Sequence, residues 1–547
     1  MALFKKKAQS EPIQAPKGPE KIVPENPYLG REPIISREQA IIGYELFFRP
    51  GTTLKAKRLN DRNEVLAQIA KRLAEDPKAE VSYPEDVTDA NLRDDDGKEV
   101  TQVTLPEIFY SLKTKGVTQS LGQHLGFIDI RVDQLGDELR GFPAIKFPLQ
   151  IHLAEILEAI KTEASQVTET VEDPEVKKDL DDSGEPPVPE VLQKLERLRS
   201  AGYKFVLTGL TEVFDGLDDI LPKFRYIKLD LQKVAKPSSL IDYCKGIPLP
   251  RDEKSKGAAN VLQIIAVNVH EPEEFHQARD VGCDAFEGFY FVKPDPELSL
   301  HRGEEYRKLL QLLTLLLSSP ELKDLVTAIE ANPVVSKHLM VIAEIDSRRK
   351  RDKPENIRDA AVISGVKRIT RWTQLLLYAD AKAKVALDAT PLLQLVCVRA
   401  FFMESLSTKL GAGGGLGSSD LAFLVGGLSL IDNLFDESAR ELLSHFNLPS
   451  VVVDAIVDRS GILGQLLSLA EAAEVGDLEK CRHLCADELK TVTLDDVAQD
   501  SLLAIKNFVA QTQFAPEEDV WENANSVPEE SSQELWGSWA PDHSCWT

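Results

Sequence analysis

Two patterns of hydrophobic positions divide the chain near residue 297. Before that point, short runs rich in Ile, Val, Phe and Tyr alternate with stretches of helical spacing. Strands are predicted at 33–35, 41–48, 127–131, 205–210, 226–230, 261–267 and 285–291. Helices are predicted between several of them, including 189–201 and 272–281. This α/β alternation favours parallel β-α units, and a closed TIM-type barrel is their commonest form.

The second part of the chain has helical spacing throughout. Leucines recur at 309, 310, 312, 313 and 316, which is typical of a helix buried on a wide face, and strand-like alternation is absent after residue 297. Further helices are predicted at 360–378, 392–409, 421–434, 438–446 and 450–458. We therefore expect an all-α domain over residues 298–512, with Trp372 as a core residue.

Composition narrows the class of protein. The 547 residues carry a net charge of −25, which argues against nucleic-acid binding by charge neutralisation and against adsorption to an anionic membrane. Six scattered cysteines do not suggest a disulfide framework, and no apolar run is long enough to cross a membrane. The first residues also lack the apolar run of a signal peptide. We expect a cytoplasmic protein without membrane insertion.

Both ends differ from the rest of the chain. Residues 1–28 are rich in proline and are predicted to form a disordered arm, and the acidic segments 84–98 and 163–187 are predicted to be surface insertions. In the predicted tail, 513–547, residues 516–547 hold eight acidic residues and no Lys or Arg. Four of the five tryptophans lie there, at Trp521, Trp536, Trp539 and Trp546. Two interpretations stay open, a solubility tail or a docking motif that inserts tryptophans into a partner.

Short motifs in the first part suggest a family. They are REPIISR from Arg31, IGYELFFR from Ile42, FIDI from Phe127, GYKFVL from Gly202, YIKLD from Tyr226 and DAFEGFYFVKP from Asp284. In this order they resemble the EAL domain, a TIM-barrel family that hydrolyses cyclic di-GMP. The resemblance assigns residues 29–297 to an EAL-type barrel.

The helical part has motifs of its own. They are IEANPVVS from Ile329, ITRW from Ile369, VRAFFME from Val398 and FLVGGLSLID from Phe423. These resemble the HDOD domain, an interaction module, and the order of the two domains resembles a class of bacterial signalling proteins. That resemblance implies regulation of motility, attachment or another cyclic di-GMP output, with other signalling proteins as partners. It is also compatible with a homodimer.

The EAL resemblance implies positions for a catalytic site. An active site of this kind needs converging carboxylates that hold two divalent metals. Glu45 matches the motif glutamate, Lys228 the lysine that orients water, and Arg49 the arginine that faces a phosphate. Asp129 stands where the family has Asn and Glu287 where it has Gln. A further metal-binding glutamate is expected at Glu155 or Glu158.

Several metal-binding residues of both families are replaced. Thr208 and Gly209 stand where the EAL family has paired aspartates, and Val267 stands where it has a glutamate. In the HDOD-like part, Ser429 and Leu430 occupy the place of the His-Asp pair of the parent superfamily, and neither residue can replace that pair. We therefore expect no catalytic residue, bound metal or cofactor in either domain.

Three hypotheses follow, in decreasing order of support. The first is a non-enzymatic signalling protein that acts through protein–protein contacts. The second is an effector that binds cyclic di-GMP through Arg49, Glu45 and Lys228 without hydrolysing it; the competing interpretation is a structural ion pair between Glu45 and Arg49. The third is a residual metal-dependent phosphodiesterase.

Overall fold

The computed structural model describes most of the chain between residues 21 and 512. Within that range it leaves out 24, 76–78, 88–91, 94–97, 99, 101–102, 115, 137–138, 140, 171–187, 251–260, 296–303, 319, 351–352, 380–386, 412–418, 435–437 and 447. Most of the predicted arm, the whole predicted tail and the predicted domain boundary at 297 lie outside the described residues.

The chain forms two compact units. The smaller comprises Met1–Pro27 and Arg49–Glu107, and the larger comprises Tyr28–Phe48 and Ile108–Thr547. In the smaller unit, Asn60 exchanges two hydrogen bonds with the Ile22 backbone, at 2.6 and 2.9 Å. The last residues of the predicted arm are thus held by side-chain contacts.

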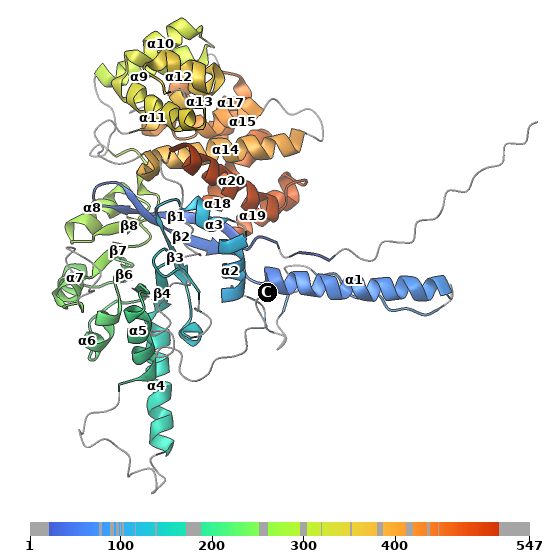
Figure 1. The fold of residues 1–547 in the computed structure, drawn as a ribbon, viewed down its shortest axis with the longest axis vertical. Coiled ribbons are helices and arrows are strands. Elements are labelled where there is room, and N and C mark those ends of the chain that lie inside the picture. Colours follow the sequence, from blue (N-terminus) through green and yellow to red (C-terminus); the bar gives the residue numbers. More distant parts are fainter. Residues whose placement is uncertain are drawn as a thin grey trace, which may run out of the picture. The chain divides into compact units, whose positions relative to one another are not determined.

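Eight strands of the larger unit close into a barrel, in the order of the chain (Figure 1). They are β1 Tyr28–Ser36, β2 Ile41–Phe48, β3 Leu125–Asp129, β4 Leu149–His152, β5 Phe205–Thr208, β6 Tyr226–Leu229, β7 Gln263–Ala266 and β8 Ala285–Glu287. From β2 to β8, each strand pairs in parallel with the next. The prediction of a TIM-type barrel is confirmed.

The first strand departs from the prediction in direction and length. β1 runs antiparallel to both β2 and β8, because only four residues join it to β2 and so short a connection forms a hairpin. β1 also begins at Tyr28, which is fully buried. The arm predicted over residues 1–28 therefore includes one residue of the barrel. The antiparallel register places Glu32 opposite Glu45.

The described α-helices lie on both sides of residue 297 in the sequence. Those before residue 297 are α1 Thr52–Glu75, α2 Leu105–Thr114, α3 Val117–Ser120, α4 Leu153–Thr170, α5 Glu190–Ser200, α6 Leu217–Ile220, α7 Pro237–Gly246 and α8 Pro272–Asp280. The others are α9 Glu304–Leu317, α10 Leu322–Glu330, α11 Pro333–Lys350, α12 Ile357–Ser364, α13 Val366–Leu375, α14 Pro391–Gly411, α15 Ser419–Leu428, α16 Ala439–Ser444, α17 Ser450–Asp458, α18 Gly461–Glu474, α19 Leu478–His483 and α20 Leu494–Thr512.

The region after residue 303 is helical in every described element, as predicted. One predicted helix, 360–378, is instead divided into α12 and α13, because Gly365 between them has a φ of +86°. Trp372 is buried in the core of this region. Among the described helices, none is by itself long and apolar enough to span a membrane, although the bent pair Leu322–Glu330 and Val335–Ile345 meets that test by length and composition.

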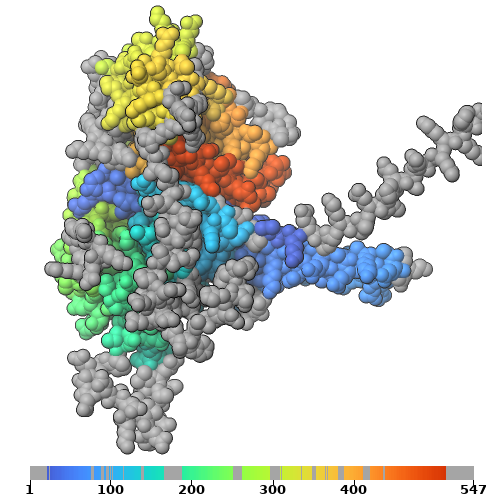
Figure 2. Space-filling model, in the orientation of Figure 1, coloured from blue at the N-terminus to red at the C-terminus, as the bar shows by residue number. Residues whose placement is uncertain are grey.

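The C-terminal helices pack directly on the barrel (Figure 2). α18 and α20 contact β1, and a Cβ added at Gly30 would lie 2.1 Å from the Ala473 carbonyl oxygen. The Tyr44 hydroxyl donates to Gln394 Oε1 at 2.8 Å, which joins β2 to α14. Because Tyr44 is the neighbour of Glu45 in β2, this contact lies one residue from the interior of the barrel.

Candidate functional site in the barrel

Polar side chains inside the barrel lie above an apolar layer. Ile34, Phe127, Val206, Ile265 and Ala285 pack together as that layer. Side chains two positions apart in a strand point to the same face. The residues two positions from them on β1, β3 and β8 are therefore also interior, and they are Glu32, Asp129 and Glu287. Strand geometry thus gathers carboxyl groups from distant parts of the chain.

Lys228 lies at the centre of this polar layer. Its ammonium nitrogen forms ion pairs with Glu45 and with Glu287, the second at 2.5 Å. The same nitrogen lies 5.3 Å from the centre of the Phe127 ring below it. Lys228 is almost fully buried, so these pairs are shielded from solvent and interact more strongly than surface pairs.

Gln150 of β4 completes the cluster. Its amide nitrogen donates to the two Glu45 carboxylate oxygens at 2.8 and 2.9 Å and to Asp129 Oδ1 at 3.0 Å. The Gln150 Oε1 atom is buried, and no hydrogen-bond partner for it occurs among the described residues. We call Glu32, Glu45, Asp129, Gln150, Lys228 and Glu287 the barrel cluster.

The barrel cluster has more carboxyl groups than cations. Burial, together with the neighbouring Glu287 and Glu45, raises the pKa of Glu32 to about 8. Burial and Glu45 raise the pKa of Asp129 to about 7, and burial also raises the pKa of Glu287. Burial alone would lower the pKa of Lys228, but Glu287 and Glu45 outweigh it and raise that pKa. Burial therefore favours the neutral acids of Glu32, Asp129 and Glu287, while the two neighbouring glutamates favour the charged form of Lys228.

The structure brings together four of the six predicted remnant positions, namely Glu45, Asp129, Lys228 and Glu287. Glu155 lies elsewhere, because it falls in the first turn of α4 and accepts a hydrogen bond from the Val132 backbone nitrogen at 3.0 Å. Its alternative, Glu158, is exposed.

Arg49 also has partners other than those expected. It pairs with Glu25 at 3.1 Å and donates to the Asn26 carbonyl oxygen at 2.5 Å. Among the described residues, Glu45 instead contacts Lys228 and Gln150. The structural ion pair expected between Glu45 and Arg49 is therefore wrong, because each group has a different counter-charge.

The end of β5 is the place where the EAL resemblance implied paired aspartates. The Thr208 hydroxyl lies 3.5 Å from the Ile151 carbonyl oxygen. Gly209 has a φ of +79°, and a Cβ there would lie 2.4 Å from Nε2 of His152. His152 in turn accepts a hydrogen bond from the Ala154 backbone nitrogen at 3.1 Å through Nδ1. The imidazole therefore occupies the space into which a side chain at 209 would extend.

Two divalent metals do not fit these residues. Val267, a further lost position, follows β7 and contributes no carboxyl group, and Gln150 and Lys228 already engage Glu45. Across the described part of the chain, no three or more His, Cys, Asp or Glu residues form a group that could hold a metal ion.

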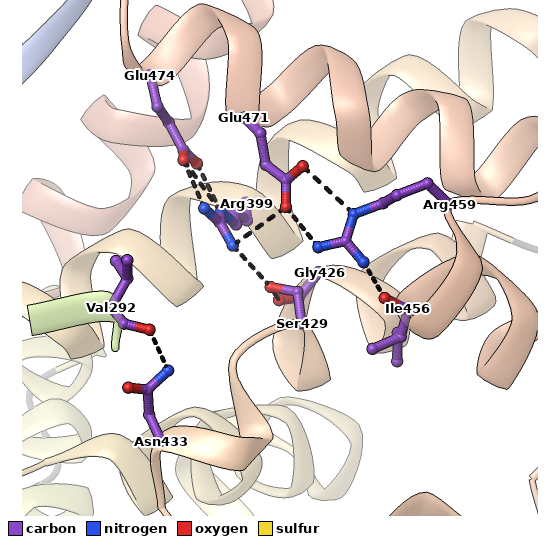
Figure 3. A network of polar contacts seen from close by, with 9 residues as sticks. All are labelled: Val292, Arg399, Gly426, Ser429, Asn433, Ile456, Arg459, Glu471 and Glu474. Carbon is purple, nitrogen blue, oxygen red and sulfur yellow. Dashed lines mark hydrogen bonds and ion pairs between the residues drawn. The ribbon is translucent and has the colours of Figure 1, made fainter. Parts of the chain in front are cut away.

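The helical region contains a buried charged network beside Ser429, which stands with Leu430 where the HDOD resemblance places the His-Asp pair of the parent superfamily (Figure 3). Arg399 of α14 binds both carboxylate oxygens of Glu474, with nitrogen–oxygen distances of 2.7 to 3.1 Å. It also donates to the Ser429 hydroxyl at 3.3 Å, and that hydroxyl donates to the Gly426 carbonyl oxygen at 2.9 Å. Leu430 is buried in the apolar core.

Two residues of the barrel cluster, Gln150 and Glu32, were not predicted from the sequence. Gln150 was missed because β4 has only four residues and was not recognised as a strand, although Gln150 alternates with the buried Leu149 and Ile151. Glu32 was missed because the motif REPIISR, in which it lies, indicates a first strand but not which of its side chains face the barrel interior. The four tail tryptophans, Trp521, Trp536, Trp539 and Trp546, lie outside the described residues.

Comparisons with known proteins agree with the resemblance drawn from the motifs. The chain is 23% identical over 479 residues to a Vibrio cholerae protein named cyclic di-GMP phosphodiesterase CdgJ, covering 87% of this chain and 91% of that protein. It is also 23% identical over 305 residues to the uncharacterized protein YuxH of Bacillus subtilis, covering 55% of this chain and 71% of that protein. The first alignment is long enough to include both the barrel and the helical region.

A solved structure is similar at a lower level. The EAL enzyme Bd1971, with cAMP and cyclic di-GMP bound, aligns with 48% of this chain at 14% identity and a TM-score of 0.26. The alignment covers 60% of that chain, which is less than two thirds of its length. No family model matches the chain. The chain is therefore related, at low identity, to a protein named as a cyclic di-GMP phosphodiesterase.

Proposed function

We propose that this chain is a non-enzymatic signalling protein of the cytoplasm, built from a degenerate EAL-type barrel over residues 29–297 and an HDOD-like helical module over 298–512. In this proposal the barrel has lost phosphodiesterase activity, and the chain acts through protein–protein contacts. The sequence relation to CdgJ and the motif order support the lineage.

The observation that carries the proposal is the end of β5. Hydrolysis of a phosphodiester by two metals needs carboxylates that neutralise the metals and position water. Here Thr208 carries a hydroxyl and Gly209 carries no side chain. The His152 ring lies against Gly209, so a carboxylate brought from elsewhere would first have to displace it.

The charges that surround this position support the same conclusion. Two carboxylates of the barrel cluster, Glu45 and Glu287, are already paired with Lys228. Burial raises the pKa of Glu32 and of Asp129, so a metal ion would have to displace protons from these groups near neutral pH. Arg49, which would have to face a phosphate, is paired with Glu25.

The helical module is proposed to be an interaction module for a parallel reason. Ser429 and Leu430 stand in place of a metal-binding pair, and Arg399 next to them brings a positive charge into that space. The guanidinium is almost fully buried and paired with Glu474. Such a cation opposes the binding of a metal ion at the same place.

The test is turnover of cyclic di-GMP by the purified full-length protein with Mg²⁺ or Mn²⁺. We expect no ring-opened linear dinucleotide by chromatography, while an active EAL phosphodiesterase assayed in parallel hydrolyses the substrate. Metal-dependent product that disappears in the Glu45→Ala variant would overturn the proposal, and product that persists in that variant would indicate a contaminating enzyme and require a repeat with repurified protein.

A calorimetric titration of cyclic di-GMP into the same protein distinguishes two of the hypotheses. One is a protein that acts only through protein–protein contacts, and the other is an effector that binds cyclic di-GMP without hydrolysing it. We expect no saturable heat, because the cations Arg49 and Lys228 are both engaged by carboxylates. Saturable binding without product would instead support the hypothesis that the chain is a cyclic di-GMP receptor.

A further inference from the structure

A groove lined by cations crosses the helical region. It lies among α13, α14 and α20 and has a volume of about 590 Å³. Three of its lining residues, Lys367, Arg368 and Arg371, are cationic, and none of its lining residues in the described part of the chain is acidic. This is unusual in a chain with a net charge of −25. We call this surface the basic groove.

Aromatic side chains lie beneath and beside these cations. Trp372 and Phe401 both line the basic groove, and their rings meet edge to face at 6.4 Å between centres. Trp372 is buried and Phe401 is half-buried, so Phe401 provides accessible aromatic surface. Cations next to an aromatic face are suited to a ligand that carries both carboxylates and aromatic rings.

One cation of the basic groove, Lys367, has a partner that is easily exchanged. Lys367 and Arg371 both pair with Asp420, and Arg371 also pairs with Glu404 at 2.7 Å. The side chains of Lys367 and Asp420 are 71% and 52% exposed, so their pair contributes little to stability. Lys367 is therefore the cation of the groove whose partner an acidic ligand replaces most readily.

The described part of the chain ends at the edge of this groove. Gln511 of α20 accepts hydrogen bonds from the Trp372 indole nitrogen at 3.0 Å and from Arg368 at 2.8 Å. These contacts fix the last turn of α20 against α13. Thr512, the next residue, is the last of α20, so the tail 513–547 starts beside the groove.

The composition of this tail complements the basic groove. Its first acidic residues, Glu517, Glu518 and Asp519, come five to seven positions after Thr512, and Trp521 comes two positions later. An extended chain spans about 3.3 Å per residue, so these side chains can reach the groove from Thr512. A covalent tether of this length also gives a high effective concentration, on the order of millimolar.

We propose that the acidic tail, residues 513–547, docks in the basic groove of its own chain. Tail carboxylates pair with Lys367, Arg368 and Arg371, and a tail indole packs beside Phe401. The docked tail occupies the groove and withholds its own tryptophans, so an external partner of either surface competes with it. This inference does not depend on whether the barrel hydrolyses cyclic di-GMP.

Zero-length cross-linking of the full-length protein tests the contact. A carbodiimide joins a carboxylate to a lysine amine that it already touches, and mass spectrometry then locates the link. We expect links from tail acids to Lys367. Lys233 on the barrel is an internal control, since its side chain is also 71% exposed and is also paired with an aspartate. Tail links that are no more frequent at Lys367 than at Lys233 would overturn the proposal.

An equal mixture of ¹⁵N-labelled and unlabelled protein distinguishes the occupants. Docking within one chain gives cross-linked peptides with a single label, whereas mixed labels would assign the groove to the tail of a second copy and overturn the proposal as stated.

Tryptophan quenching gives an independent measurement on the intact chain. Four of the five tryptophans lie in the tail, so acrylamide quenching reports mainly on their exposure. We expect Lys367→Glu and high salt each to increase quenching, because both weaken the attraction to tail carboxylates. Lys233→Glu is the matched control and should leave quenching unchanged. Equal quenching in the wild type, in Lys367→Glu and in high salt would contradict the docked tail.

Discussion

Two buried charge clusters of this chain differ in balance. The barrel cluster sets four carboxyl groups, Glu32, Glu45, Asp129 and Glu287, around the single cation Lys228. The helical cluster pairs two arginines with two glutamates (Figure 3). Arg399 contacts Glu474 and Glu471, and Arg459 contacts Glu471. Charge is therefore in excess in one cluster and compensated in the other.

This difference separates a cluster that responds to its surroundings from one that supports the fold. An excess of buried carboxyl groups requires protons or another cation, and the raised pKa values of Glu32 and Asp129 express that requirement. A balanced network is satisfied from within, but loss of one member leaves a buried charge without a partner. Substitutions in the two clusters should therefore differ in size and in pH dependence.

The largest effect is expected for Arg399→Met. This change keeps much of the side-chain volume but leaves Glu474 buried without its counter-charge. Breaking a buried pair in this way costs about 3–5 kcal/mol of unfolding free energy. Urea unfolding at pH 7, followed by circular dichroism, measures it.

Arg440→Met is the matched control for that measurement. Arg440 pairs with Asp458, but both side chains are more than half exposed, at 57% and 51%. Its loss should cost less than about 1 kcal/mol. Equal costs for the two variants would show that the helical cluster contributes no more than a surface pair.

A smaller effect is expected for Lys228→Met. The substitution leaves Glu45 and Glu287 without their shared ammonium. Burial already raises the pKa of Glu287, so this carboxyl group can become neutral, and the cost is about 2–3 kcal/mol at pH 8. The added rise in carboxyl pKa makes this cost shrink as the pH falls toward 5. A cost that does not change between pH 5 and pH 8 would show that the carboxyl groups do not titrate.

Glu32→Gln should stabilise the protein at high pH. The pKa of Glu32 is raised from 4.5 to about 8, so the neutral acid is favoured in the folded state. Its contribution is fully present below about pH 4.5 and is lost as the pH rises through about 8. A glutamine keeps the shape without the charge, so we expect a gain of about 1–2 kcal/mol at pH 8 and little change at pH 5.

Thermal unfolding at pH 5, 6.5 and 8 measures this gain. Glu38→Gln, on the exposed hairpin that follows β1, is the control and should behave like the wild type at each pH. A stability of Glu32→Gln that follows the wild type at all three values would contradict the excess of charge in the barrel.

Much of the barrel could be predicted from the sequence because its strands are short, apolar and bounded by helices. Seven of the eight strands were recognised at least in part, but β4 was not. The direction of β1 could not be inferred from hydrophobic pattern alone, because alternation reports which face is buried and not which neighbour is paired. The division between α12 and α13 rests on the backbone of Gly365, which the helical spacing around it conceals.

The site was predicted less completely, since it depends on which side chains meet across the barrel. The motifs placed Glu45, Asp129, Lys228 and Glu287 together, but the order of motifs could not show that Gln150 donates to two of them. The EAL resemblance implied Glu155 or Glu158 as a ligand, whereas Glu155 accepts a hydrogen bond from the Val132 backbone and Glu158 is exposed. The barrel cluster as a binding site stays a prediction.

The smallest effect concerns Gly209, where the sequence showed a missing carboxylate but not what fills its place. Gly209→Ala places a Cβ 2.4 Å from His152 Nε2 and also puts alanine at a φ of +79°. We expect a loss of about 1–2 kcal/mol of unfolding free energy, of which roughly 1 is conformational. Gly216→Ala measures the conformational part alone, since Gly216 has a φ of +92° and a Cβ there meets nothing within 4 Å. The double variant Gly209→Ala/His152→Ala should return the cost to that of Gly216→Ala. Failure of this rescue would show that the imidazole does not occupy the space beside β5, and the proposal of a degenerate barrel would lose the support of this contact.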